Sequence, residues 1–130
     1  MRRSHTRASV AAAAGTALLA AVHVARSLAS AGSVSYVEAL NVGKATLACL
    51  AALKMCRDNC FESRLAAVVL ALISGLGAVL GSTLGLPGQQ ADAVTPGDVA
   101  LVLLGLGVPL LVLHDQRLRR GQALRSPYAS

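Results

Sequence analysis

Five polar residues could form a cluster inside a largely apolar chain: His23, Arg26, Glu38, Asn41 and Lys44. Their imidazole, carboxylate, amide and ammonium groups can bind an ion or move a proton. Ionisable residues within a membrane usually pair with one another and face the interior of a bundle or a wet cavity. The alternative is structural. Arg26 and Glu38 would then be interfacial, Lys44 would extend its stem toward the interface, and His23 would bond a backbone carbonyl.

The cysteines raise the question of a metal site. The membrane topology that we predict below places five residues with metal-binding groups on the cytoplasmic side: His5, Cys56, Cys60, His114 and Asp115. The C-x-x-x-C spacing differs from the C-x-x-C of zinc knuckles, and Arg57-Asp58-Asn59 fits a turn equally well. With Cys49 the number of cysteines is odd, so we expect free thiols, no metal and no cofactor.

Catalytic motifs are missing from the sequence. It contains no Ser-His-Asp arrangement, no glycine-rich phosphate loop and no paired catalytic carboxylates. Every Asp and Glu falls near a predicted interface or in a loop, which weakens a proton-driven transport mechanism. We therefore predict that the protein is not an enzyme.

The composition indicates what kind of element positions these residues. Hydrophobic residues make up 55% of the chain, tryptophan is absent and the mean hydropathy is +0.61. An α-helix needs roughly 20 apolar residues to cross the hydrocarbon layer. We predict an all-α, polytopic transmembrane four-helix bundle whose spans are residues 8–28, 39–55, 65–86 and 99–114.

The basic residues predict how these helices are oriented. Ten of the twelve Lys and Arg residues lie in three clusters, residues 2–7, 54–64 and 117–125. Cytoplasmic loops and tails of membrane proteins carry such clusters. Only a four-span topology puts all three on one side, so the second segment must span even though Lys44 interrupts it. The N-terminus and the C-terminus are then both cytoplasmic.

This topology divides the chain into a short basic tail at residues 1–7, a transmembrane domain at 8–116 and a second basic tail at 117–130, which we expect to be disordered. Residues 1–31 also resemble a secretory signal. Their apolar run is longer than usual and Arg26 precedes the small-residue cleavage site. Cleavage would leave three spans and an external start.

The net charge of +6 could indicate nucleic-acid binding. The basic residues form no continuous stripe, however, and no aromatic residues are interleaved with them for stacking. We expect the basic residues to interact with the headgroups of the lipid bilayer and not with nucleic acid.

Three glycines in the third span recur every four residues: Gly77, Gly81 and Gly85. Small residues at this spacing let helix backbones approach closely in lipid. The spacing therefore predicts a helix-packing face. The common use of glycine and alanine in this chain is the alternative explanation. Whether the face meets another span, a second copy or a larger membrane protein stays open.

Three features of the sequence resemble small four-helix integral membrane proteins of actinobacteria, which are mostly uncharacterised. They are the segment Ser82-Thr83-Leu84-Gly85-Leu86-Pro87-Gly88, His23 in the first span and the Arg-rich end of the chain. The resemblance implies a fold and a location in the bacterial cytoplasmic membrane, and it carries no function. Small multidrug-resistance transporters are similar only in outline, because their first-helix glutamate and their aromatic residues have no counterpart here.

Two functions are compatible with these features. The first is a non-enzymatic accessory or assembly protein that uses the glycine face to form a homo-oligomer or to dock on a larger membrane protein. The second is a small channel, a holin-like pore former or a solute transporter, in which the polar cluster on the outer half of the first two helices lines a path.

Overall fold

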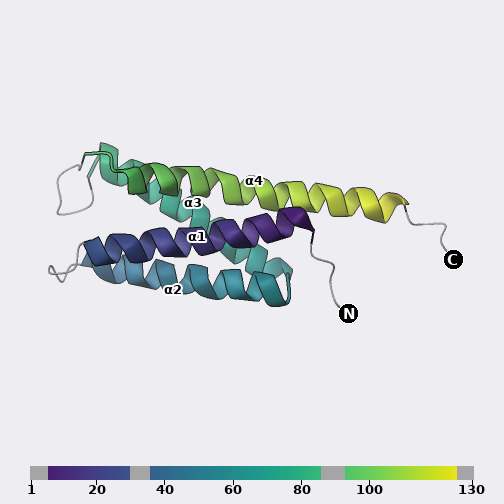
Figure 1. The fold of residues 1–130 in the computed structure, drawn as a ribbon. Helices are drawn as coiled ribbons and strands as arrows, with labels where there is room; N and C mark the ends of the chain where they lie inside the picture. Colours follow the sequence, from purple (N-terminus) through teal and green to yellow (C-terminus); the bar gives the residue numbers. More distant parts are fainter. Residues whose placement is uncertain (1–5, 30–35, 86–92, 126–130) are drawn as a thin grey trace.

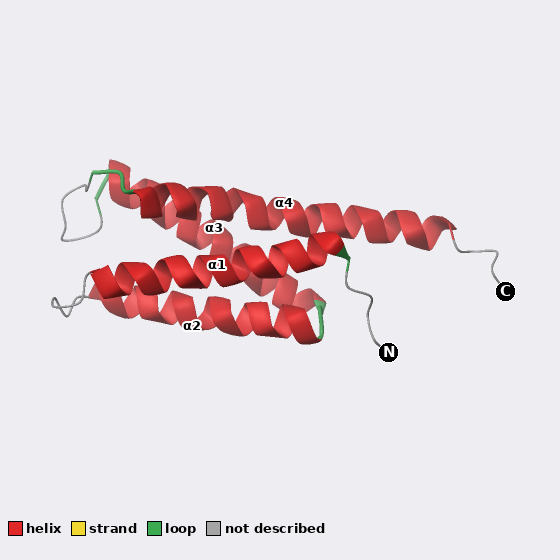
Figure 2. Cartoon of the chain, viewed as in Figure 1, coloured by secondary structure: helices red, strands yellow, loops and turns green. Residues whose placement is uncertain are grey.

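The computed structural model describes residues 6–29, 36–85 and 93–125, and this part of the chain is helical (Figures 1 and 2). The helices are α1 (Arg7–Ala29), α2 (Tyr36–Arg57), α3 (Phe61–Thr83) and α4 (Pro96–Arg125). The predicted all-α class and the number of helices are confirmed.

All four helices are long and apolar enough to cross a membrane. They include α2, in which Lys44 interrupts the apolar run. Large apolar side chains cover the outer surface of each helix, for example Leu18, Leu47, Leu76 and Leu103. Such a surface suits lipid and not water, because all four helices expose many large apolar side chains. The chain therefore has the form of a multi-pass membrane protein.

The connection between α2 and α3 is a tight turn. The amides of Asp58 and Asn59 both donate to the carbonyl oxygen of Lys54, at 2.9 and 3.3 Å. Asn59 has a φ of 43°, in the left-handed region that asparagine tolerates better than most residues. This conformation ends α2 and allows α3 to begin at Phe61.

The third helix ends earlier than predicted. The span was expected to reach residue 86, but α3 ends at Thr83 and Leu84 is its C-cap, with its amide bonded to the carbonyl oxygen of Leu80 at 2.9 Å. Gly85 follows with a φ of 77°, the left-handed conformation that commonly terminates a helix. Gly85 therefore stops the helix and contributes to no helical face.

The fourth helix is longer than predicted at both ends. Thr95 caps its start, because its hydroxyl accepts from the amide of Asp98 at 3.3 Å while the Asp98 carboxylate accepts from the amide of Thr95 at 3.0 Å. At the other end the helix continues to Arg125, through nine residues of the expected disordered tail. Asp115 and Arg119 support this extension with an ion pair one turn apart, at 2.9 Å.

The helices form an elongated bundle in which α1 packs against α2 and α4, and α3 packs against α4 and less extensively against α2 (Figure 1). The start of α1, the turn between α2 and α3 and the end of α4 lie at one end of the bundle. We call this the inner end and the opposite one the outer end. The names follow the predicted orientation.

The core consists mainly of small residues. Leu19, Met55 and Val108 are the largest fully buried apolar side chains of the described residues, and alanines such as Ala12, Ala67 and Ala71 make up much of the remaining core. Small side chains let helix axes come close, and dispersion contacts then replace the hydrophobic effect that lipid cannot supply. At Gly75 of α3 and Gly105 of α4 the two helix backbones face each other in close contact.

Candidate functional site

Four of the five predicted polar residues line one cavity in the outer half of the bundle. They are His23 and Arg26 of α1 and Asn41 and Lys44 of α2, and α3 adds Ser74 and Gly77. The cavity volume is about 80 Å³. Glu38 is not among the residues that line it. The antiparallel arrangement of α1 and α2 thus brings the predicted cluster together with one exception.

His23 lies at the centre of this site and is only 1% exposed. Its Nε2 is 2.8 Å from the hydroxyl oxygen of Ser74. Its Nδ1 is buried and has no hydrogen-bond partner within the described part of the chain. The partner that the sequence did not predict is therefore Ser74, which lies on the small-residue side of α3.

Lys44 turns its side chain into the bundle. Its ammonium nitrogen lies 4.0 Å from the position that a Cβ on Gly77 would occupy. Gly77 was predicted to pack against a helix, but a side chain at this residue would instead face the lysine. The missing side chain of Gly77 thus makes room for the charge of Lys44.

Arg26 pairs with the carboxylate of Asp98, at the start of α4. Thr95 binds the same carboxylate through its hydroxyl, which donates to the second carboxylate oxygen at 2.6 Å. Asp98 is buried, so this ion pair links the end of α1 to the cap of α4. The sequence placed Arg26 in the cluster, and the structure shows that its acidic partner is Asp98 and comes from the far end of the chain.

A second polar site, at the inner end, was not predicted as a unit. The carboxylate of Asp115 in α4 is 1% exposed and lies 2.6 Å from Arg64 of α3 and 2.9 Å from Arg119. Arg64 also donates through its Nε to the side-chain oxygen of Asn59, at 2.9 Å. The hydroxyl of Thr6 donates to the same carboxylate. A single aspartate thus connects the beginning of α1, the α2–α3 turn, α3 and α4.

One sequence signal for this inner site was present. Asp115 lies two residues after the apolar run of the last span and is followed by arginines, in a segment that the charge pattern places on the same side of the membrane as Arg64. The arginines were interpreted only as markers of orientation. A buried carboxylate among them is what a bundle needs if one arginine points inward.

The cysteines do not come together as a metal site. Cys49 and Cys56 are exposed, Cys60 is partly buried, and all three are free. Among the described residues, no three His, Cys, Asp or Glu side chains are grouped so that they could hold a metal ion. His5 lies outside the described residues. The sulfur of Cys60 lies 3.5 Å from the hydroxyl oxygen of Ser63. Hydrogen bonds donated to the thiolate by the side chain and the amide of Ser63 lower the pKa of Cys60 below its ordinary value.

The close helix contact uses different small residues from those predicted. Ala67, Ala71 and Gly75 recur every four residues on α3 and are buried, and Gly75 faces Gly105. Gly81 is partly buried and Gly77 lies beside Lys44. The buried column of small residues thus lies about half a turn away from the glycine column that the sequence made most visible.

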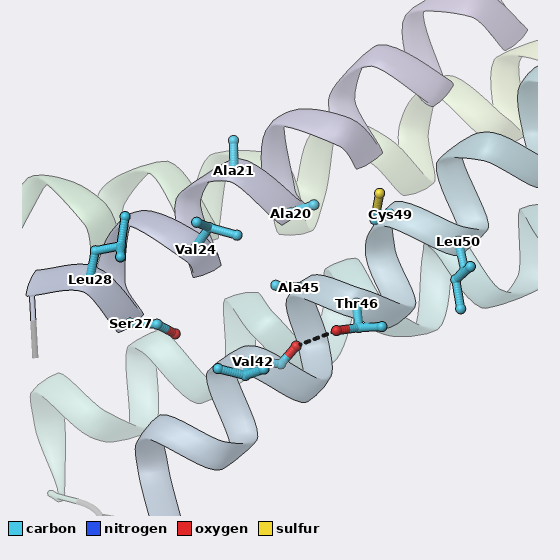
Figure 3. Close-up of a pocket in the computed structure, with 10 residues that line it drawn as sticks. All are labelled: Ala20, Ala21, Val24, Ser27, Leu28, Val42, Ala45, Thr46, Cys49 and Leu50. Carbon is cyan, nitrogen blue, oxygen red and sulfur yellow. Dashed lines mark hydrogen bonds between the residues drawn. The ribbon is translucent and has the colours of Figure 1, made fainter. Parts of the chain in front are cut away.

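An apolar groove runs between α1 and α2 on the surface of the bundle (Figure 3). Its volume is about 550 Å³. Small residues contributed by both helices line it, namely Ala20, Ala21, Ser27, Ala45, Thr46 and Cys49, with Val24, Leu28, Val42 and Leu50 beside them. The Thr46 hydroxyl adds little polarity, because it donates to the carbonyl oxygen of Val42 at 2.9 Å. The groove is therefore an apolar surface that suits contact with other apolar groups.

Comparison with known protein families, with curated proteins and with solved structures finds no match for this chain.

Proposed function

We propose that the chain is a non-enzymatic accessory or assembly protein of the bacterial cytoplasmic membrane, with both ends in the cytoplasm, which acts by packing against another membrane helix. The observation that carries this proposal is the groove between α1 and α2. It is open to the surface, apolar and built largely from small residues. Such residues allow the close backbone approach by which helices associate in lipid.

The groove is a better docking surface than the predicted glycine face. Gly85 lies beyond the end of α3, and Gly77 accommodates Lys44. Gly75, the glycine of α3 with the tightest surroundings, is already used against Gly105 within the bundle. The partner we envisage is an apolar helix of a second copy or of a larger membrane protein.

A channel or transporter through a single bundle receives less support from the same structure. The outer cavity holds only about 80 Å³. Toward the inner end the bundle is filled by Thr16, Leu19, Ala71 and Val108, all almost completely buried. A path for an ion or solute would have to separate helices that are closely packed here.

Cys49 provides the test, because it lines the groove and is exposed. In membranes of cells that express a Cys56→Ser, Cys60→Ser variant, a thiol-reactive photocrosslinker that inserts into C–H bonds should join Cys49 to its neighbour in the groove. Mass spectrometry of the product then distinguishes a second copy from another protein. Ala21→Leu, which projects a larger side chain into the groove, should reduce the crosslinked product several-fold.

The matched control is Gly107→Leu on α4, a position with no neighbouring atoms within 4 Å of an added Cβ and not among the groove residues. It should leave the crosslinked product unchanged. Loss of crosslinking in both variants would indicate a general effect on the membrane fraction. The same yield with Ala21→Leu as without it would contradict docking in the groove.

A further inference from the structure

The outer cavity is lined by positive charge and hydrogen-bond donors, which is an unusual interior for a membrane bundle. Lys44 and Arg26 supply the charges, and Asn41, His23 and Ser74 supply polar groups. No carboxylate is found among the cavity-lining residues of the described chain. The carboxylate of Asp98 is already bound by Arg26 and Thr95.

The charge of Lys44 requires an explanation. Along the axis of α2 it lies roughly 12 Å from the first residue of the helix, and the apolar side chains of Leu40, Val42 and Leu47 are exposed around it. Its ammonium approaches Gly77 inside the bundle, and it forms no ion pair or hydrogen bond with any described residue. Lys44 is partly buried, and a charge that is partly removed from water without a counter-charge is unfavourable.

His23 provides the second and independent observation. It is almost completely buried, and its Nε2 shares one hydrogen bond with Ser74. If Ser74 donates that bond, the imidazole carries its proton on Nδ1, and this N–H has no acceptor among the described residues. If Nε2 donates instead, the hydroxyl proton of Ser74 is unused. Either tautomer leaves one donor in the lining of the cavity without an acceptor.

We infer that this cavity binds a small inorganic anion, of the size of a halide. An anion there would neutralise Lys44 and accept the hydrogen bond that His23 or Ser74 cannot otherwise make. The volume of about 80 Å³ accommodates one such ion or a few water molecules and excludes a larger organic anion. Because Gly77 has no side chain, this space beside the ammonium group of Lys44 stays open.

The test uses the purified full-length protein in nonionic detergent, with chloride as the probe and gluconate, which is too large for the cavity, as the replacement at constant ionic strength. Chloride should raise the midpoint of thermal unfolding in a saturable way, because it binds only the folded state. Lys44→Met should abolish this dependence on chloride. Lys54→Met, which removes an exposed lysine from the same helix, should retain it.

Gly77→Leu serves as a second variant, because it keeps the lysine but fills the space beside it. Line broadening of the chloride NMR signal measures binding directly in all variants and does not depend on their stability. We expect broadening for the wild-type protein and for Lys54→Met, and its loss for Lys44→Met and Gly77→Leu. Broadening that survives in Lys44→Met, or an unfolding midpoint equal in chloride and gluconate, would overturn the inference.

Discussion

A Cβ atom added to Gly105 would lie 3.0 Å from the Cα of Gly75, because α3 and α4 touch backbone to backbone at this point. The same Cβ would lie 3.0 Å from the carbonyl oxygen of Ala71. Neither neighbour is the end of a flexible side chain. The helices must therefore separate to accept any other residue, and the contact depends on both glycines.

We predict that Gly105→Ala destabilises the bundle by about 1–3 kcal/mol, the usual cost of overpacking a tight contact. The free energy of unfolding in mixed micelles of a denaturing and a nonionic detergent measures this change. Gly107→Ala is the control two residues away, where an added Cβ meets no atom within 4 Å. It should be neutral or slightly stabilising, because alanine favours a helix over glycine. Equal effects of the two variants would contradict the close contact.

Asp115 should be the most sensitive charged residue of the chain. Asp115→Asn leaves Arg64 buried without its counter-ion, and the expected loss of stability is about 3 kcal/mol, as for other broken buried pairs. The comparison is Glu62→Gln, which breaks a pair with Lys54 whose side chains are 79% and 50% exposed. Such a pair contributes about 0–1 kcal/mol.

A double-mutant cycle separates the ion pair from other effects at this position. Arg64→Leu combined with Asp115→Leu removes both charges, so the double variant should be more stable than the sum of the single changes implies. Detergent-induced unfolding of the four proteins gives the coupling. Additive single changes would show that Arg64 and Asp115 do not depend on each other.

The membrane-spanning pattern could be predicted because it depends on long stretches of chain. Apolar length alone located the first and third helices, and the last was accepted as a short span. The distribution of Lys and Arg residues indicated that the segment containing Lys44 also spans. The antiparallel order of the helices then indicated the depth of each polar residue in the membrane. For this reason the sequence could predict that residues up to 21 positions apart lie near one another, and in the structure His23, Arg26, Asn41 and Lys44 line one cavity.

The rotation of each helix about its axis could not be predicted in the same way. In water a polar face and an apolar face distinguish outside from inside, but here alanine, leucine and valine occur on every face, since lipid and core are both apolar. The sequence therefore showed that α3 carries small-residue columns without showing that Gly75 faces Gly105. Nor could it show that Arg26 meets Asp98, because that pair depends on which sides of α1 and α4 face each other.

The thiol of Cys60 should ionise more readily than an ordinary cysteine. The hydrogen bond from Ser63 lowers the pKa of Cys60, so more of the reactive thiolate is present at neutral pH. In a Cys49→Ser, Cys56→Ser variant, the midpoint of the pH–rate profile for alkylation should lie below that of free cysteine. The midpoint is the better measure, since the intrinsic reactivity of a thiolate falls with its pKa.

Ser63→Ala in the same background should move this midpoint toward higher pH. Ser82→Ala, which removes a hydroxyl that donates only to the carbonyl oxygen of Val79 at 3.1 Å, should not. A profile unaffected by Ser63→Ala would mean that the hydroxyl does not influence the thiol.

The orientation of the bundle can be decided with the same cysteines. If the inner end faces the cytoplasm, a membrane-impermeant maleimide added to intact cells should not label Cys56, which is exposed at that end. For the opposite side, Val94→Cys in a Cys49→Ser, Cys56→Ser, Cys60→Ser background places a thiol just before α4, where the native side chain is 66% exposed. This variant should be labelled from outside. Labelling of Cys56 without labelling of the residue 94 thiol would show that the arginine clusters lie on the external side, against the positive-inside rule.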